Sequence, residues 1–336
     1  MYPVSMERAF MPKTKLLVIC PRDHYVLRNL APLYNLSEIA ISNDQAELEK
    51  LAPEADVILF TGLSGATVNW PTVWEHATSV RWVHSLSAGV EQMLFPALVD
   101  SNVSLTNARG VFKRSLAEFA VLGILFHTKK LRRLIDNQRD RKWGNFTVNF
   151  ANERVIGVIG YGEIGRECAR LGKGLGMKIL AIRRNPMKSA DDAIADRIFG
   201  PAELHEMLAR IDVLLCAAPL TPETHHMVSD AQFKVMKPTA IVVNVGRGPV
   251  IDEAALIRAL QSQQIAGASL DVFEHEPLPV TSPLWGMENV LISPHCTDRT
   301  TDPDCLDLSM QMFIENLHRY QNHEPLRNVV DKKAGY

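Results

Sequence analysis

The sequence predicts a parallel α/β protein with two domains. Its 336 residues exceed the usual size of a single domain. Short apolar runs alternate with helix-like segments along most of the chain, which is typical of parallel sheets whose strands are joined by helices. The strand candidates also fall into two series, and a long helical segment separates them.

The first series predicts the N-terminal part of the fold. The apolar runs "KLLVIC" (15–20), "DVILF" (56–60) and "RWVHSL" (81–86) are expected to be strands. Between the first two, "QAELEKLAPEA" (45–55) is expected to be a helix. Residues 1–14 contain two prolines and scattered charges but no apolar signal core, so we expect a loose leader; an organelle-targeting role stays open.

Two amphipathic segments define the expected domain boundaries. Apolar residues recur at helical spacing over 114–143, and the basic end of this segment suits a helix C-terminus. The segment 305–321 has the same periodicity and is expected to return the chain to the first domain. We therefore predict a substrate domain of 1–109 with 299–336, and a dinucleotide-binding domain of 110–298.

The second series supplies six further strand candidates within about 140 residues, enough for one sheet with helices on both faces. In chain order they are "RVIGVIG", "KILAI", "DVLLCAA", "AIVVNV", "AGASLDVF" and "NVLISP". Directly after the first of them, Gly160, Gly162 and Gly165 form a G-x-G-x-x-G pattern that leads into a helical segment. This context predicts a turn that lets a dinucleotide pyrophosphate approach a helix N-terminus.

A second strand after such a turn often ends in an acid that holds the ribose 2′-hydroxyl. Here the strand "KILAI" is followed by Arg183 and Arg184, the first of them eighteen residues after Gly165. A carboxylate would repel a 2′-phosphate, whereas a guanidinium binds it with two charge-assisted hydrogen bonds. The sequence therefore predicts NADP(H) as the preferred cofactor, with NAD(H) possible and surface charge as the alternative role of the arginines.

Composition excludes several other classes of protein. The net charge is −2 and no dense basic tract occurs, so we expect neither a nucleic-acid nor a membrane partner. The longest apolar runs are about half a membrane span. The five cysteines are odd in number and lack C-x-x-C spacing, so we expect no disulfide framework, no metal site and a reducing, cytoplasmic location. The pair His225–His226 is expected to lie in a loop without metal.

Three later strands each lead to polar residues that suit one reaction. The first delivers Arg247, the second Asp271, Glu274 and Glu276, and the third His295. Ligands of open α/β sheets collect at the carboxyl ends of the strands. An arginine for a carboxylate, a histidine for a proton and an acid to hold the imidazole predict dehydrogenation of a hydroxy acid.

In these motifs the sequence resembles the D-isomer-specific 2-hydroxyacid dehydrogenases, a family that includes glyoxylate/hydroxypyruvate reductases. The resemblance runs from about residue 55 to 325. Its motifs, in order, are "GYGEIG", "PLTPETHHMV", "VNVGRGPVIDEAALIRAL", "DVFEHEPLP" and "PLWGMENVLISPH". It implies two Rossmann-like domains, a flavodoxin-like substrate domain and a doubly wound NAD(P)-binding domain, with the active site in the cleft between them. It also implies a homodimer formed through the cofactor domains.

The resemblance also assigns residues to roles. The catalytic Arg, Glu and His fall on Arg247, Glu276 and His295, and Asp271 would lie near the nicotinamide amide. The loop "SLSAGVEQM" would bind the substrate carboxylate through backbone N–H groups, which would supplement Arg247. The substrate-loop residues are Ala88, Gly89 and Val90; the remaining cofactor contacts are Gly160, Tyr161, Gly162, Glu163, Ile164, Gly165, Ala218 and Pro219.

The implied function is an NADPH-preferring reduction of 2-oxo acids to D-2-hydroxy acids. An alternative is a dinucleotide-sensing interaction protein, because the family fold includes transcriptional corepressors. A formate-type dehydrogenase is disfavoured by Glu276, since those enzymes pair their histidine with an amide. Neither alternative changes the predicted fold.

Two stretches depart from the commoner family pattern. "CTDRTTDPDC" follows "SPH", where small residues and glycine are usual, and it places Cys296 and Asp298 beside His295. On an extended chain Cys296 would point away from His295, so we expect no thiol nucleophile. Phe112, Lys113 and Arg114 are bulky or charged near the expected hinge. Both stretches, with the loop 61–68, leave the substrate side chain open.

Overall fold

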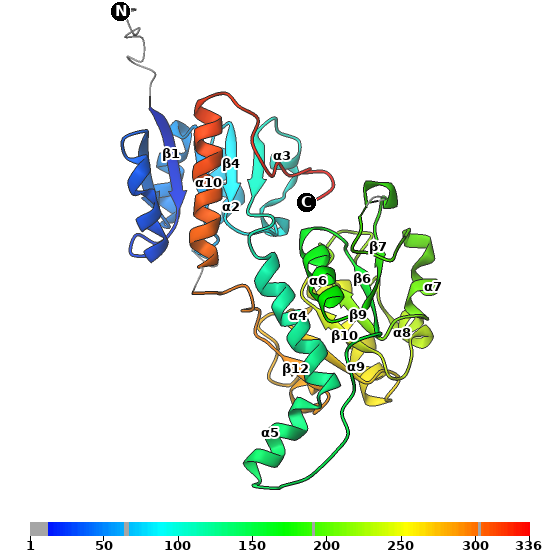
Figure 1. Cartoon of the computed structure of the whole chain (residues 1–336). Coiled ribbons are helices and arrows are strands. Elements are labelled where there is room, and N and C mark those ends of the chain that lie inside the picture. Colours follow the sequence, from blue (N-terminus) through cyan, green and yellow to red (C-terminus); the bar gives the residue numbers. More distant parts are fainter. Residues whose placement is uncertain (1–12, 64–66, 190–191, 302–303) are drawn as a thin grey trace, which may run out of the picture. The chain divides into compact units, whose positions relative to one another are not determined.

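The structure, a computed structural model, describes residues 13–63, 67–189, 192–301 and 304–336. The chain divides into two compact units. The first unit combines Met1–Val111 with Asp302–Tyr336, and the second is Phe112–Thr301. Each unit is built on one parallel sheet (Figure 1), which confirms the predicted α/β class and its two parallel-sheet domains.

The sheet of the first unit has the strand order β2-β1-β3-β4-β5, and every pairing is parallel. This is the order of a flavodoxin-like sheet. The strands are β1 (Thr14–Ile19), β2 (Ser37–Ser42), β3 (Val57–Phe60), β4 (Trp82–Ser85) and β5 (Ser104–Asn107). The expected strands at 15–20, 56–60 and 81–86 are thus present, whereas β2 and β5 were not predicted.

Helices cover both faces of this sheet because the side chains of its strands alternate between the faces. In β1, Leu16 and Val18 pack toward α10 (Cys305–Gln321) and η1 (Tyr25–Leu33). Leu17 and Ile19 pack on the other face, toward α1 (Gln45–Leu51), α2 (Trp70–His76) and α3 (Pro96–Val99). Three-residue helical turns, η2 (Ala52–Glu54) and η4 (Glu91–Met93), complete the unit.

The sheet of the second unit has the strand order β12-β11-β10-β9-β6-β7-β8, again all parallel. Its strands are β6 (Val155–Ile159), β7 (Lys178–Ile182), β8 (Arg197–Phe199), β9 (Val213–Cys216), β10 (Ile241–Asn244), β11 (Gly267–Leu270) and β12 (Val290–Ile292). All six predicted strands are present, and only the three-residue β8 is additional. The chain builds outward from β6 in one direction and from β9 in the other, so the order reverses between these neighbours.

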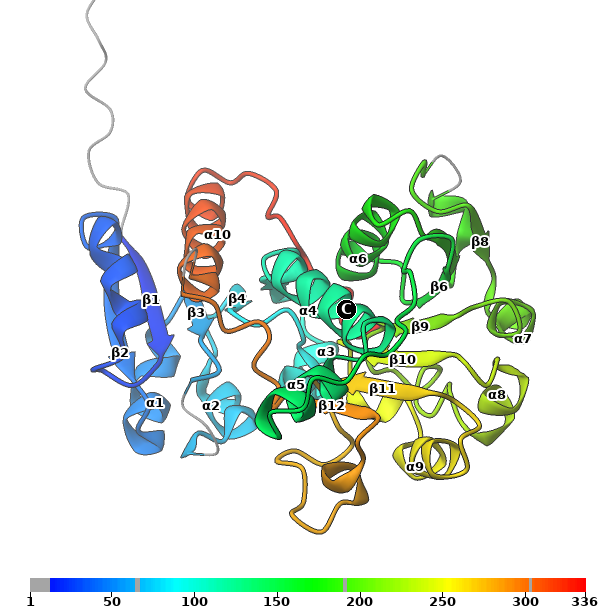
Figure 2. The same ribbon diagram turned by 60° about the horizontal axis from the view of Figure 1, so that its bottom comes forward.

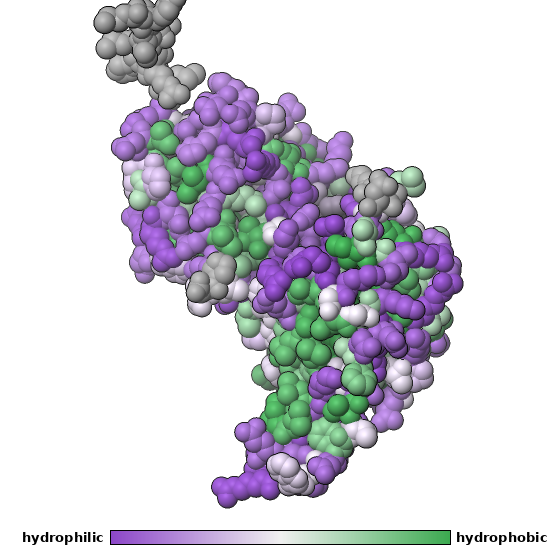
Figure 3. All heavy atoms as spheres, viewed as in Figure 1, coloured by the Kyte–Doolittle hydropathy of each residue, from purple (hydrophilic) through white to green (hydrophobic). Residues whose placement is uncertain are grey.

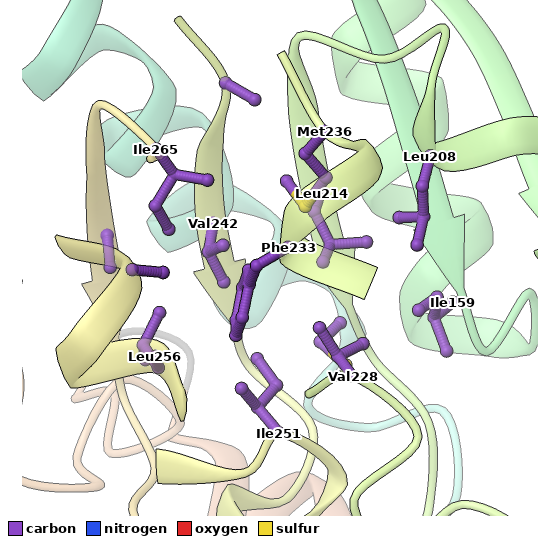
Figure 4. Packing of buried hydrophobic residues seen from close by; sticks show 14 of the residues in the cluster. Ile159, Leu208, Leu214, Val228, Phe233, Met236, Val242, Ile251, Leu256 and Ile265 are labelled. Carbon is purple, nitrogen blue, oxygen red and sulfur yellow. The ribbon is translucent and has the colours of Figure 1, made fainter. Parts of the chain in front are cut away.

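Helices lie on both faces of this second sheet (Figure 2). On one face, α4 (Lys113–Thr128) and α6 (Glu163–Gly174) pack against the strands. The approach of α4 is close, because a Cβ on Gly123 would lie 2.8 Å from the Cβ of Ser269. On the other face are α7 (Leu204–Leu208), α8 (Asp230–Val235) and α9 (Glu253–Gln261). Phe233 of α8 is fully buried among Val242, Leu214 and their neighbours (Figure 4).

The sequence predicted one helix over the segment 114–143, but the structure has two helices there. The helix α4 ends at Thr128, and α5 (Leu131–Arg139) begins after two intervening residues. Lys130 between them has a φ of 54°, and a right-handed helix cannot continue through a left-handed residue. Short helical turns elsewhere in the unit are η5 (Pro186–Ser189), η6 (Pro201–Glu203), η7 (Gly248–Val250) and η8 (Pro283–Gly286).

Among the described residues, no helix combines the length and the apolar character that crossing a bilayer requires.

Candidate active site

The glycine turn after β6 lies at the point where the strand order reverses. A Cβ on Gly160, whose φ is +86°, would come within 2.4 Å of the backbone nitrogen of Ala218 after β9. A Cβ on Gly165 would come within 2.3 Å of the carbonyl oxygen of Gly160, so this glycine lets α6 pack closely. Around Gly162, in contrast, no atom lies within 4 Å of such a Cβ, and the residue is exposed. Two glycines thus serve packing, and the third leaves open space where a pyrophosphate could approach the N-terminus of α6.

The other residues of the turn differ in accessibility. Tyr161 has only 2% of its surface exposed, so its side chain is part of the protein interior. Glu163 begins α6 and pairs with Lys113 of α4 at 3.1 Å. Ile164 is half-buried. Pro219 follows the buried Ala218, and its carbonyl oxygen accepts a hydrogen bond from the Thr224 hydroxyl at 2.7 Å.

The arginines after β7 lie at the same edge of the sheet as the glycine turn. Ile159 of β6 pairs with Ile182 of β7, so Gly160 and Arg183 follow their strands at the same level. Arg183 is half-buried and donates a hydrogen bond to the Ser189 hydroxyl. Arg184 is exposed. A hydrogen bond from Thr221 and, more weakly, the charge of Arg184 lower the pKa of Glu223, so this arginine lies near that carboxylate.

An ion pair fastens the chain after these arginines to α6. Arg166 of α6 donates to Asp192 at 2.5 Å. Tyr161 lies close by, because burial first and the charge of Asp192 second raise the pKa of its phenol. This connection could not be predicted from the sequence, since neither Arg166 nor Asp192 belongs to a motif.

Arg247 follows β10 in a loop with little freedom. The side chain of Asn244 accepts a hydrogen bond from the N–H of Gly246 at 3.1 Å and donates one to the carbonyl oxygen of Arg247 at 3.2 Å. A Cβ on Gly246 would lie 2.8 Å from the carbonyl oxygen of Ala218, and one on Gly248 would lie 1.9 Å from the carbonyl of Phe273. The loop is therefore packed between the ends of β9 and β11. This packing fixes the backbone position from which the Arg247 side chain extends.

His295 and Glu276 form a hydrogen-bonded pair at the ends of β12 and β11. The distance from His295 Nδ1 to Glu276 Oε2 is 2.6 Å. The other carboxylate oxygen, Oε1, accepts the N–H of Phe273 at 2.9 Å, which fixes the orientation of the acid. His295 has a φ of 48°, so the chain is not extended there, and the argument that placed Cys296 on the opposite face does not apply.

The electrostatics of this pair favour an imidazolium beside a carboxylate. The hydrogen bond to Glu276 raises the pKa of His295 above its usual value, while burial and the charge of Arg247 oppose the shift. Burial alone would raise the pKa of Glu276, but the hydrogen bonds from His295 and Phe273 outweigh it and lower that pKa. His295 is thereby biased toward its protonated form.

Glu274, the neighbouring candidate acid, has different partners. Its carboxylate contacts His226 Nε2 at 2.6 Å and accepts the N–H of Glu253 at 3.1 Å. The Glu253 carboxylate in turn accepts the N–H of Glu274 at 3.1 Å. His226, stacked on His225, is thus engaged with a single acid, and no group of side chains in the described ranges has the composition of a metal site.

Asp271 is buried, with 1% exposure, and its carboxylate is already engaged by the turn after β12. Oδ1 accepts the Ser293 hydroxyl at 2.7 Å and the N–H groups of Cys296 and Thr297 at 3.2 and 3.4 Å. Oδ2 accepts the Thr297 hydroxyl at 2.6 Å. A carboxylate has about four acceptor directions, so Oδ2 keeps one for a further donor.

The loop expected to bind the substrate carboxylate lies after β4 in the first unit. Ala88 and Gly89 are half-buried and Val90 is buried. The side chain of Asn107 donates to the Ala88 carbonyl at 2.6 Å, which holds the loop from behind. Over the ranges of the chain that the structure describes, the backbone N–H groups of these three residues donate no hydrogen bond, so they are available to an anion.

All five cysteines lie in the described part of the chain, and none forms a disulfide. Cys20, Cys168, Cys216 and Cys305 are buried, and burial raises the pKa of Cys168 and of Cys216 to about 12. Cys296 is partly exposed, and its sulfur lies 3.5 Å from the Ser293 hydroxyl.

Comparison with known proteins identifies the family. The sequence model of the family "D-isomer specific 2-hydroxyacid dehydrogenase, NAD binding domain" matches residues 121–297, more than half of the chain. A glyoxylate reductase of Thermococcus gammatolerans is 33% identical over 271 residues, which cover 78% of this chain and 79% of the relative. The chain belongs to this family. Its members' defining reaction makes it an NAD(P)-dependent oxidoreductase that acts on 2-hydroxy acids, and the resemblance seen in the sequence is confirmed.

Other D-isomer specific 2-hydroxyacid dehydrogenases are similar in sequence or in structure. A glyoxylate/hydroxypyruvate reductase B of Yersinia enterocolitica is 32% identical over 266 residues, covering 77% of this chain and 79% of the relative. The crystal structure of an NADPH-dependent glyoxylate/hydroxypyruvate reductase from Sinorhizobium meliloti, in complex with NADP and sulfate, has a TM-score of 0.83 at 26% identity. It covers 96% of this chain and 100% of that chain. A family member from Xanthobacter autotrophicus in complex with NADPH and MES has a TM-score of 0.81 at 28% identity, with coverage of 97% and 100%.

The contact between Glu276 and His295 generates a prediction about pH. Glu276→Gln removes the negative charge that favours the imidazolium, so the pKa of His295 will fall. NMR titration of the His295 ring in the free protein measures this directly. Glu274→Gln is the matched control, because Glu274 contacts His226 and Glu253 instead. An unchanged His295 titration in Glu276→Gln would contradict the geometry.

Proposed function

We propose that the protein reduces 2-oxo acids to D-2-hydroxy acids with NADPH as the preferred hydride donor. The observation that carries the proposal is the hydrogen-bonded pair of His295 and Glu276. It follows strands of the same parallel sheet whose carboxyl edge also carries Arg247 and the glycine turn. The names of the T. gammatolerans and Y. enterocolitica relatives support the same class of substrate.

In this proposal the carboxylate of the substrate is held by positive groups. Arg247 offers a planar fork of N–H donors that matches a carboxylate with two parallel hydrogen bonds. The first unit would act as the substrate domain, with the backbone N–H groups of Ala88, Gly89 and Val90 as further donors. Arg247 would also polarise the adjacent carbonyl, because its charge favours the alkoxide that develops during reduction.

His295 would supply the proton in the same step. A bound nicotinamide supplies the hydride to C2 of the substrate, and the imidazolium of His295 donates its proton to the carbonyl oxygen. Since Nδ1 of the ring faces Glu276, the proton that reaches the substrate belongs to Nε2. Glu276 keeps the imidazolium favourable before the transfer and fixes the orientation of the ring afterwards.

The preference for NADPH rests on the residues after β7. Arg183 and Arg184 occupy the place where a carboxylate would bind a ribose 2′-hydroxyl, and a guanidinium suits a 2′-phosphate instead. The NADP and NADPH bound in the S. meliloti and X. autotrophicus structures support this choice. The free acceptor direction of Asp271 Oδ2 would receive the nicotinamide amide. NADH carries the same amide, so NADH would also bind.

The protein is further proposed to form a homodimer through its second unit and to lie in the cytoplasm. Apolar side chains of α5 and of the segment after it are exposed, and Figure 3 shows apolar surface over α4 next to α5. Trp143 is 96% and Phe150 is 80% exposed. Exposed apolar surface of this kind marks protein interfaces, and a second copy of the chain would cover it. The five cysteines, all in the described part of the chain, form no disulfide with one another, which suits the reducing cytoplasm.

The proposed activity is tested by NADPH oxidation with glyoxylate, hydroxypyruvate and bulkier 2-oxo acids. We expect turnover of at least one acid, and His295→Asn should reduce it by roughly 10²-fold or more, because the proton donor is lost. Binding of NADPH to His295→Asn, followed by fluorescence titration, should stay near that of the unchanged protein. Tight NADPH binding without turnover of any acid would instead favour a dinucleotide-sensing interaction protein. Near-normal turnover by His295→Asn would exclude its role as the acid.

The cofactor preference is tested with Arg183→Asp. The new carboxylate repels the 2′-phosphate and can accept the 2′-hydroxyl, so kcat/KM should fall far more for NADPH than for NADH. Lys234→Asp reverses the charge of an exposed residue on α8 and serves as the control. An equal response of the two cofactors would mean that Arg183 is surface charge.

The homodimer is tested by light scattering on a size-exclusion column. We expect twice the 37.5 kDa mass of one chain, and a single-chain mass for the double variant Ile135→Glu/Trp143→Glu, because charge is then placed within the apolar contact. Val280→Glu, at a side chain that is 93% exposed elsewhere in the second unit, should leave the mass unchanged. A monomer before any substitution would overturn this assembly.

A further inference from the structure

The turn that carries His295, residues 293–298, includes Cys296 and Asp298, which depart from the commoner family pattern. His295 has a φ of 48°, in the left-handed region that residues other than glycine rarely adopt. Such a conformation persists only where the surroundings hold it. The groups that hold the turn 293–298 therefore also set the position of the imidazole.

Thr297 is the residue of this turn that hydrogen-bonds both to Asp271 and to α4. Its hydroxyl donates to Asp271 Oδ2 at 2.6 Å, and its N–H donates to Oδ1 at 3.4 Å. Its carbonyl oxygen accepts a hydrogen bond from the Ser115 hydroxyl on α4. The turn is thus tied to the end of β11 on one side and to the first turn of α4 on the other.

The partner Asp271 makes the Thr297 hydroxyl consequential. The carboxylate is 1% exposed, so each lost donor leaves a charged oxygen without solvent to replace it. Oδ2 has the Thr297 hydroxyl as its one donor within the described ranges, whereas Oδ1 has three donors from the same turn. Removal of that hydroxyl therefore frees the turn from Asp271 Oδ2, and only the hydrogen bonds to Oδ1 remain.

We propose that Thr297 is a positioning residue for His295, which holds the turn through Asp271 and Ser115 so that the ring meets Glu276. The role of the pair in reduction rests on the proposed function, but the geometry of the turn does not. Thr297 lies in "CTDRTTDPDC", which departs from the commoner pattern, and Ser115 directly follows the unusual residues Phe112, Lys113 and Arg114; a hydrogen bond joins the two residues.

The charged groups that face His295 come from several elements. Glu276 and Asp271 follow β11, Arg247 follows β10, and Asp298 belongs to the turn itself. Glu276 is the one in hydrogen-bond contact with the ring, and it favours the imidazolium most strongly. If the turn loosens and this contact is lost, the pKa of His295 falls. A change in the His295 titration thus reports on its position.

The test compares Thr297→Val with Thr297→Ser. Valine keeps the shape of threonine without the hydroxyl, whereas serine keeps the hydroxyl. In the free full-length protein, NMR titration should show a lowered pKa of His295 in Thr297→Val and an unchanged one in Thr297→Ser. With NADPH and glyoxylate, or whichever 2-oxo acid is turned over, kcat of Thr297→Val should be about 10- to 100-fold lower, with the KM for NADPH unchanged. The alkaline limb of kcat should move to lower pH, because His295 must be protonated to donate.

Two further variants control the result. Ser115→Ala removes the other tie and should shift the His295 titration in the same direction. Thr239→Val removes an exposed hydroxyl two residues before β10, at the opposite edge of the sheet, and should change nothing. An unchanged His295 titration in Thr297→Val, or an equal shift in Thr297→Val and Thr297→Ser, would overturn the proposal. If the unchanged protein reduces no 2-oxo acid, the proposed function fails while the titration still decides the role of Thr297.

Discussion

The backbone contact at Ala218 is the constraint on which the rest of the site depends. Gly160 approaches it from the turn after β6, and Gly246 approaches it from the loop after β10. A side chain at either glycine would overlap the backbone of Ala218, so both loops close on the end of β9 only because they carry hydrogen there. The glycine turn after β6 and the start of the Arg247 loop consequently have a fixed spacing at the carboxyl edge of the second sheet.

Regular features of the fold were predictable from the sequence. The six strands of the second sheet that were predicted are continuous apolar runs, because a parallel sheet with helices on both faces buries both sides of its strands. The strand β8 was missed because it has three residues and begins with an exposed arginine. In β2 only the two end residues are buried, so its sequence lacks the apolar run that marks the central strands. The break between α4 and α5 at Lys130 could not be predicted, because no glycine or proline stands there.

The candidate site also has features that could be predicted from the sequence and features that could not. Motif order was sufficient to propose Arg247, Glu276 and His295, and the structure puts the last two in contact. The burial of Tyr161, the pairing of Arg166 with Asp192 and the hydrogen bonds from the turn after β12 to Asp271 could not be predicted, because each depends on how distant segments meet. The assumption of an extended chain at His295 was wrong for the same reason. The turn there is shaped by Asp271, which precedes it by 24 residues.

The distribution of thiols in this fold has a practical consequence for chemical labelling. Four of the five cysteines are buried, where the thiolate that reacts with alkylating reagents is disfavoured. Cys296 is the partly exposed one, and it lies next to His295 in the chain. The folded protein therefore carries a natural attachment point for a fluorophore or spin label at the turn that holds the imidazole. A reporter placed there would sense ligand binding without any engineered cysteine.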